Sequence, residues 1–220
     1  MLAEELIVDN IPSLKSTDTG EKALRWMDDY KVTHLCVLDN GNYLGVLSES
    51  DVLSLNNLEA PLSKHRDLLN PIFVKRSQHI FEVVKVVNDH KLTMVPVLDG
   101  DDHYCGSITM GQLMEIIADM PVANNIGAII VLELNINDYA LSPIAAIIEE
   151  NGTKILGTFI TSHEDSTKMQ LTIKVNRTDI QSILASLLRH EYVVQVFNSN
   201  EGSEEDLRDR FDSLMNYLNV

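Results

Sequence analysis

The chain has 220 residues, of which 45% are hydrophobic, so it is long enough to bury a core and to form more than one domain. Its formal net charge of −16 argues against a nucleic-acid partner, whose phosphates need a basic surface, and against an anionic membrane. No apolar run reaches the roughly 20 residues of a membrane span. The acidic residues 1–5 lack the basic start of a signal peptide. We therefore expect a cytoplasmic protein.

The sequence also lacks the common signatures of metal sites and of catalysis. Its seven histidines are scattered, without His-x-x-x-His or Cys-x-x-Cys spacing. Cys36 and Cys105 lie in apolar, strand-like segments, which is typical of buried and reduced thiols. Walker A, Gly-x-Ser-x-Gly and Gly-x-Gly-x-x-Gly motifs are missing. We expect no metal, no cofactor and no disulfide, and a binding protein rather than an enzyme.

The first half of the chain is an internal repeat with a period of sixty residues. Residues 31–39, KVTHLCVLD, return as residues 91–99, KLTMVPVLD. The first copy predicts a helix at 21–30, strands at 34–38 and 43–47 around a hairpin turn, and a helix beginning at Ser48. The second copy predicts a helix at 83–90, strands at 94–98 and 104–108, and a helix beginning at Thr109. Neither copy can bury its own sheet face, so the two should pack pseudo-symmetrically.

After Met120-Pro121 the hydrophobic pattern changes. It predicts a strand at 126–134, a helix from Ser142 to the Asn151-Gly152 cap, strands at 154–160 and 169–175 around the turn 163–166, a helix after Asp179 and a strand at 192–197. This β-α-β-β-α-β order is the ferredoxin-like arrangement. A polar linker at 198–202 then leads to an amphipathic helix at 203–220, which either covers its own domain or forms a dimer contact.

Each copy has a related motif where its second strand leads into a helix, Gly45-Val46-Leu47-Ser48-x-x-Asp51 in the first copy and Gly106-Ser107-Ile108-Thr109 in the second. Together with the sixty-residue period, these motifs resemble a tandem pair of CBS domains, known as a Bateman module. The resemblance places one repeat at 1–62 and the other at 63–121. Residues 125–198 look like an ACT domain, and the combination is similar to bacterial CBS–ACT regulatory proteins such as the acetoin-utilisation family. The expected fold class is α+β, with two packed β-β-α repeats, a ferredoxin-like ACT-like domain and a C-terminal helix.

The CBS resemblance implies an adenine nucleotide, such as AMP, ATP or S-adenosylmethionine, in the cleft between the repeats. Ser48 and Asp51 match the family's Ser/Thr-x-x-Asp element, whose carboxylate accepts hydrogen bonds from ribose hydroxyls. In the second copy Thr109 is kept, but Gln112 stands in place of the Asp. Taken alone, Ser-x-x-Asp at a helix start favours an approximate capping box, and it is the CBS context that makes ligand binding an equal alternative. The further candidates for lining the cleft, with lysines meeting phosphate, are Thr33, His34, Lys31, Lys75 and Lys91.

The sequence leaves three functions open. The first is a nucleotide sensor that transmits its ligand state through homodimer geometry to an unidentified regulated protein. The second is a CBS–ACT dimerisation scaffold with no ligand, and the third is an enzyme of unrecognised type. ACT-like domains also invite an amino-acid effector. Here the loop at 135–143 has Asp138, but Ser142 replaces the glycine that lets the backbone approach a ligand.

Overall fold

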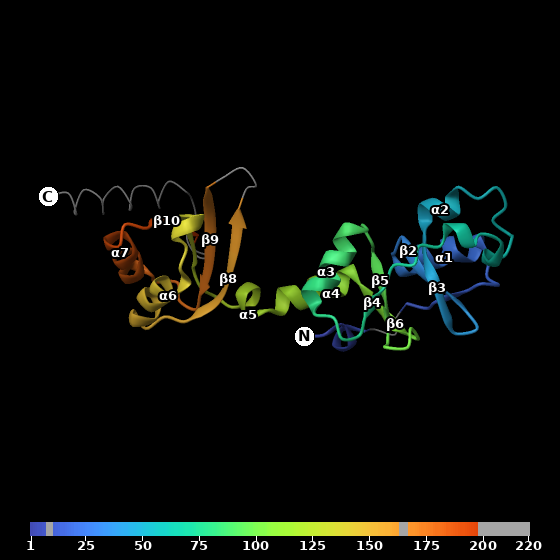
Figure 1. The fold of residues 1–220 in the computed structure, drawn as a ribbon, viewed down its shortest axis with the longest axis horizontal. Helices are drawn as coiled ribbons and strands as arrows, with labels where there is room; N and C mark the ends of the chain where they lie inside the picture. The colour runs from blue at the N-terminus through green and yellow to red at the C-terminus, as the bar shows by residue number, and fades with distance from the viewer. Residues whose placement is uncertain (8–10, 163–166, 198–220) are drawn as a thin grey trace. The chain divides into compact units, whose positions relative to one another are not determined.

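The computed structural model describes residues 1–7, 11–162 and 167–197 (Figure 1). The chain divides into two compact units, Met1–Ala118 and Asp119–Val220. The predicted turn at 163–166, linker at 198–202 and helix at 203–220 lie outside the described residues. Within the described part of the chain, no helix has both the length and the apolar character needed to cross a bilayer.

The first repeat forms a three-stranded sheet flanked by helices. Its elements are η1 (Ala3–Leu6), β1 (Leu14–Lys15), α1 (Gly20–Tyr30), β2 (His34–Asp39), β3 (Asn42–Ser48) and α2 (Glu49–Leu53). The sheet order is β1-β2-β3, with β1 parallel and β3 antiparallel to β2. The predicted hairpin is confirmed, because Asn40 and Gly41 both adopt positive φ, 50° and 88°, in the tight turn between β2 and β3.

The second repeat has the same plan. After the short helices η2 (Leu62–Lys64) and η3 (Arg66–Leu68) come β4 (Val74–Lys75), α3 (Ile80–Asp89), β5 (Met94–Leu98), β6 (Tyr104–Thr109) and α4 (Met110–Asp119). The sheet order is β4-β5-β6, again with one parallel and one antiparallel pair. The predicted β-β-α unit was therefore incomplete. The first strand of each repeat has two residues and pairs in parallel, and it is too short to show any hydrophobic periodicity.

The two repeats share a hydrophobic core. Leu35 of β2 and Leu47 of β3 are fully buried, and the same cluster contains Met94 from β5 of the other repeat. The segment that joins the repeats also returns to β3, where Asn70 and Val46 exchange backbone hydrogen bonds of 2.9 and 2.7 Å. The predicted packing of two copies against each other is confirmed.

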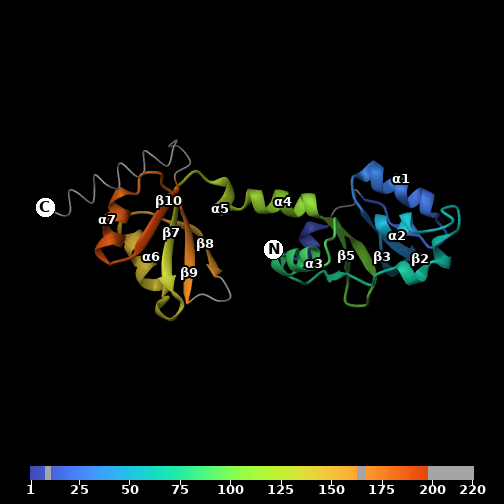
Figure 2. The ribbon, with the colours of Figure 1, turned by 90° about the horizontal axis from the view of Figure 1, so that it is seen from above.

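The second unit is a four-stranded antiparallel sheet with helices on one face. Its elements are α5 (Pro121–Asn124), β7 (Ile129–Asn135), η4 (Ile136–Asp138), α6 (Leu141–Glu150), β8 (Ile155–Ser162), β9 (Lys168–Val175), α7 (Gln181–Arg189) and β10 (Val193–Phe197). The strand order is β10-β7-β9-β8, and Figure 2 shows α6 and α7 on the same side of these strands. The predicted β-α-β-β-α-β order is observed. The short α5 had not been predicted.

Both cysteines are free thiols. Cys36 is buried in β2, and burial raises the pKa of its thiol far above the usual range. Cys105 is only half-buried in β6, where its Sγ lies 3.5 Å from the carbonyl oxygen of His103. The expectation of burial therefore holds for Cys36 and is wrong for Cys105, because Cys105 lies near the start of β6, close to the β5–β6 turn.

Candidate ligand site between the repeats

The repeats meet at two threonines that are sixty residues apart, Thr33 and Thr93. The Thr33 N–H donates to Thr93 Oγ1 at 2.9 Å, and the two hydroxyl oxygens are 3.5 Å apart. His34 joins them, because its Nδ1 lies 3.1 Å from Thr33 Oγ1 and 3.2 Å from Thr93 Oγ1. Nδ1 also accepts the Thr93 N–H at 3.3 Å. A ring nitrogen that accepts a backbone N–H carries no proton, so this geometry belongs to the neutral imidazole.

Ser48 and Asp51 lie beside this junction, at the start of α2. The β2–β3 register pairs His34 with Ser48. The Ser48 Oγ accepts the Asp51 N–H at 3.1 Å and donates to Asp51 Oδ2 at 2.6 Å, so the two residues cap the helix. Burial lowers the pKa of His34, and the nearby Asp51 carboxylate opposes that shift. The structure thus brings Thr33, His34, Ser48 and Asp51 together.

The second copy has the same backbone arrangement with fewer side-chain bonds. The β5–β6 register pairs Met94 with Thr109, and Thr109 Oγ1 accepts the Gln112 N–H at 3.1 Å. The Gln112 Oε1 is buried and has no hydrogen-bond partner among the residues that the structure describes. A buried acceptor without a donor is costly, so this oxygen is suited to a donor from outside the chain.

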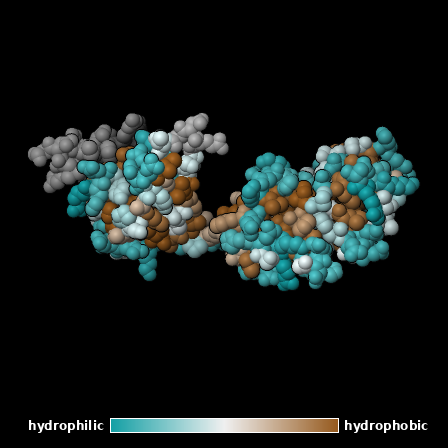
Figure 3. Space-filling model, viewed as in Figure 1, coloured by the Kyte–Doolittle hydropathy of each residue, from teal (hydrophilic) through white to brown (hydrophobic). Residues whose placement is uncertain are grey.

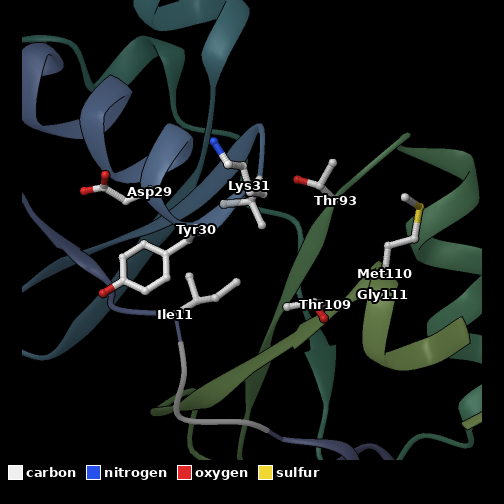
Figure 4. Close-up of a pocket in the computed structure, with 9 residues that line it drawn as sticks. Ile11, Asp29, Tyr30, Lys31, Thr93, Thr109, Met110 and Gly111 are labelled. Carbon is white, nitrogen blue, oxygen red and sulfur yellow. The ribbon is translucent and has the colours of Figure 1, made fainter. Parts of the chain in front are cut away.

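An open pocket of about 630 Å³ lies between the repeats (Figure 4). One wall comes from the end of α1 and the residues after it, and the other from β5, β6 and the start of α4. Of the residues predicted for the ligand site, only Lys31 and Thr109 line it. Its full lining is Ile11, Asp29, Tyr30, Lys31, Val32, Thr93, Thr109, Met110 and Gly111.

The predicted lysines have different surroundings. Lys31 forms an ion pair of 2.8 Å with Asp28 at the end of α1. Lys91, the corresponding residue of the second copy, donates to the Asn88 side chain at 3.1 Å. Lys75 is not brought to the pocket. Strand register pairs Lys75 with Leu98, which lies at the opposite end of β5 from Met94. The Lys75 Nζ contacts the Asp99 carbonyl and the Asp102 carboxylate.

Several pocket residues were missed in the sequence. Thr93 was not singled out, although it stands sixty residues after Thr33, and the repeat itself was the signal that could have found it. Asp29 and Tyr30 lie at the end of α1 and belong to no motif. Their part in the pocket depends on the packing of one repeat against the other, which no local pattern records.

One group of polar side chains outside the pocket has metal-ligand character. Ligand atoms of Asp99, Asp101 and His103, in the turn between β5 and β6, lie within 4.8 Å of one another. Asp99 Oδ1 already accepts the backbone N–H groups of Asp101 and His103, both at 2.9 Å. These bonds account for the turn conformation without an ion.

The family model described as "CBS domain" matches the chain twice, at residues 3–56 and 66–119. The N-terminal half of the chain is a tandem pair of CBS domains. CBS pairs are generally regulatory and non-catalytic modules.

The individual proteins and solved structures to which the chain is similar are distant relatives. A homoserine O-acetyltransferase of Methanocorpusculum labreanum is 24% identical over 119 residues, which is 51% of this chain and 23% of that protein. A CBS domain pair/ACT domain protein of Thermotoga maritima is 20% identical, with a TM-score of 0.48, over 54% of this chain and 98% of that one. The crystal structure of CBSX2 in complex with AMP is 23% identical, with a TM-score of 0.46, and the match covers 53% of this chain and 95% of that one. The chain thus spans about a quarter of the curated relative, and the family assignment rests on the CBS model.

Proposed function

We propose that this protein is a non-enzymatic regulatory module that binds an adenine nucleotide in the cleft of its CBS pair. The observation that carries the proposal is the pocket of about 630 Å³, which is lined from both repeats and flanked by Thr93 and Thr109. Its volume lies within the roughly 300–1,000 Å³ of small-molecule sites. A ligand there contacts both repeats at once, so its binding favours one relative arrangement of the two.

The polar groups at the starts of α2 and α4 suit a ribose and a base. Asp51 gives one oxygen to Ser48, but a carboxylate has about four lone-pair positions, so it can still accept ribose hydroxyls. Thr109 can donate its hydroxyl proton, since its Oγ1 only accepts from Gln112. The Gln112 Oε1 adds an acceptor that nothing in the described chain satisfies. Ser48, Asp51, Thr109 and Gln112, with Thr33, His34 and Lys31, are the proposed ligand-binding residues.

Thermal melting of the full chain with AMP, ADP, ATP and S-adenosylmethionine tests this function. A ligand at a hundred times its dissociation constant adds about 2.7 kcal/mol, which raises the melting temperature by a few degrees. Two blocking variants identify the half of the cleft that binds. Gly111→Leu fills the pocket, and a Cβ at Gly111 would meet only Thr109 Oγ1, at 3.9 Å, so folding should be preserved. Ser50→Leu makes the equivalent change beside Ser48.

The expected result is a shift with at least one ligand that one blocking variant removes and the other keeps. Asp51→Asn should weaken the shift if the Ser48 half binds, and Thr109→Ala if the Thr109 half binds. Asp67→Asn changes an exposed carboxylate outside the pocket and is the control. Unchanged melting with every ligand would overturn nucleotide binding and leave the dimerisation scaffold.

The second unit favours dimerisation as a further role. The strand register places Phe159, Val193 and Phe197 on the sheet face opposite α6 and α7, where they are 49%, 59% and 53% exposed. Apolar side chains are visible at the surface of this unit in Figure 3. We propose that this unit is an ACT-like domain that forms homodimers, as in the acetoin-utilisation family. In a cytoplasmic protein, the dimer would pass the ligand state of the CBS pair to a regulated protein. Phe159→Ser with Phe197→Ser should then lower the mass measured by light scattering.

An amino-acid effector at the ACT-like unit has less support. Asp138 lies on η4 and accepts a hydrogen bond of 3.1 Å from the Asn135 side chain. Ser142 lies in the first turn of α6, where its side chain occupies the position of the expected glycine. The same melting assay with a panel of amino acids tests this alternative, and Asp138→Ala is its matched variant.

A further inference from the structure

The pocket has two walls of opposite electrostatic character. The 11-residue α1 ends at Tyr30, so the negative end of its helix dipole lies at one wall, and its last turn contains no basic residue. Asp29 adds a carboxylate there. Figure 4 shows Asp29, Tyr30 and Lys31 along this wall and Met110 and Gly111 across from them. The far wall is the start of the 10-residue α4, which is the positive end of that helix dipole.

The single cation of the lining is balanced locally. The Lys31 ammonium is 2.8 Å from Asp28, and both side chains are about four-fifths exposed, at 79% and 81%. Among the lining residues, the α1 wall therefore offers the Asp29 carboxylate and the Lys31 ammonium, which is already paired with Asp28, and no arginine that could bind a phosphate in bidentate fashion. A polyphosphate brings several negative charges into this setting, within a chain of net charge −16.

A cationic or dipolar ligand fits the same walls better. A positive group beside Asp29 interacts favourably with the carboxylate and with the end of the helix dipole. Tyr30, which is 43% exposed, presents an aromatic ring to the same space, and such a ring attracts cations through its π face. A carboxylate elsewhere on the ligand can face the start of α4.

We infer that this pocket selects an adenosine ligand with a cationic sulfonium tail, of the S-adenosylmethionine class, over adenosine polyphosphates. The inference rests on the proposed function, since it assumes that the pocket holds an adenosine ligand. It adds the ligand class and the residues that decide it. Asp29 favours the cationic ligand, and Lys31 opposes it.

Isothermal titration calorimetry with the full chain can compare the affinities of two ligands that have nearly the same shape but differ in charge. S-adenosylmethionine and S-adenosylhomocysteine differ at the sulfur, where a methylated sulfonium replaces a neutral thioether. We expect the sulfonium ligand to bind about 3- to 5-fold more tightly, which is the size of one partly screened charge interaction. ATP should bind most weakly of the four probes, which also include AMP.

Two variants should move these affinities in opposite directions. Asp29→Asn should reduce the preference for sulfonium over thioether and tighten ATP binding. Lys31→Asn, which suits the left-handed backbone at φ 54°, should weaken ATP binding further. Asp67→Asn is the charge-matched control and should change neither ratio.

The outcomes distinguish this inference from the function on which it rests. ATP binding as tight as that of S-adenosylmethionine overturns the inference while nucleotide binding stands. So does a sulfonium preference that Asp29→Asn leaves intact. If none of the four probes binds, the proposed function fails, and the inference fails with it.

Discussion

The two CBS repeats can be compared position by position, because an offset of sixty or sixty-one residues relates them. Their backbone contacts match closely. The Glu49 N–H donates to the Thr33 carbonyl at 2.9 Å, and the Met110 N–H donates to the Thr93 carbonyl at 3.0 Å. Both sheets have the same strand order. Both β-hairpins also have a register irregularity at the equivalent place, between Val37 and Leu38 in one and between Val97 and Leu98 in the other.

The side chains at the cleft do not match in the same way. Glu49 and Ser50 in one half correspond to Met110 and Gly111 in the other, and only the second pair lines the pocket. Packing fixes the backbone contacts, since the sheets of the two repeats contribute to one shared hydrophobic core. Packing does not constrain the exposed side chains of the cleft, so they can differ between the two repeats. A pseudo-symmetric scaffold therefore offers two sites of different chemistry.

The largest expected effect tests a glycine that both repeats share. A Cβ at Gly45 would lie 2.9 Å from the Asn70 carbonyl oxygen and 3.0 Å from Leu69 Cβ, in the segment that joins the repeats. Gly45→Ala should lower the free energy of unfolding by about 3 kcal/mol, because backbone atoms there cannot move without breaking the Val46–Asn70 bonds. Urea unfolding followed by circular dichroism measures the loss.

Gly106→Ala is the matched change in the second repeat and should cost less, about 2 kcal/mol. Its Cβ would meet the side chain of Ile7, at 2.4 Å from Cγ2, and a side chain can rotate away. The remaining cost is the strain of alanine at φ 139°. Equal or negligible losses at the two glycines would contradict the contrast drawn between backbone and side-chain contacts.

A smaller difference is expected at the two helix caps. Ser48 bonds both the N–H and the carboxylate of Asp51, whereas Thr109 accepts only the Gln112 N–H. Ser48→Ala should therefore cost about 1.5 kcal/mol, and Thr109→Ala about 1 kcal/mol. The urea concentrations at the unfolding midpoints of the two alanine variants measure these losses. Ser48→Thr, which keeps a hydroxyl cap, is the control. A larger loss at Thr109 would reverse the ranking.

How far the sequence predicts this fold depends on the range of each interaction. The turn at Asn40-Gly41 and the strand at 94–98 were correctly predicted, because turn chemistry and short apolar runs are local signals. The strands β1 and β4 were missed. Two residues show no periodicity, and they become strands only by pairing in parallel with β2 and β5.

The ligand site was less predictable than the fold for the same reason. Ser48 and Asp51 are recognised from four consecutive positions. The contact between His34 and Thr93 spans fifty-nine residues and arises only when the repeats dock. Lys75 has a charge suited to phosphate, but strand register carries it to the opposite end of β5. Residue type predicted the kind of chemistry, and packing determined which residues take part.

Converting one half of the cleft toward the other should change affinity. Gln112→Asp gives the second repeat the complete Thr-x-x-Asp element. Hydrogen bonds to a charged acceptor are stronger than those to a neutral amide, so ligands with a ribose should bind about fivefold more tightly by calorimetry. Inorganic pyrophosphate, which has no ribose, is the control and should gain nothing. Weaker ribose binding would indicate that the buried position of Gln112 Oε1 does not tolerate a charge.

The smallest expected effect concerns pH, and it again contrasts the repeats, because His34 corresponds to Met94. Burial lowers the pKa of His34 below the usual value of 6.5, so the folded protein favours the neutral ring. The stability that this ring contributes is therefore present above pH 6.5 and is lost as the pH falls through the lower, folded-state pKa. Protonated Nδ1 can no longer accept the Thr93 N–H, which loosens the contact between the repeats.

Urea unfolding of the full chain from neutral to mildly acidic pH measures this effect, with the fluorescence of the single tryptophan, Trp26, as the probe of the first repeat. His34→Met should remove part of the acid-dependent loss of stability while leaving the carboxylate titrations at lower pH unchanged. The effect is small because the Asp51 carboxylate favours the charged ring and opposes burial. Adding Asp51→Asn to the wild-type background should therefore lower the pKa of His34 further and extend the loss of stability to more acidic pH. A shift toward neutral pH in that variant would mean that burial does not dominate at the junction between the repeats.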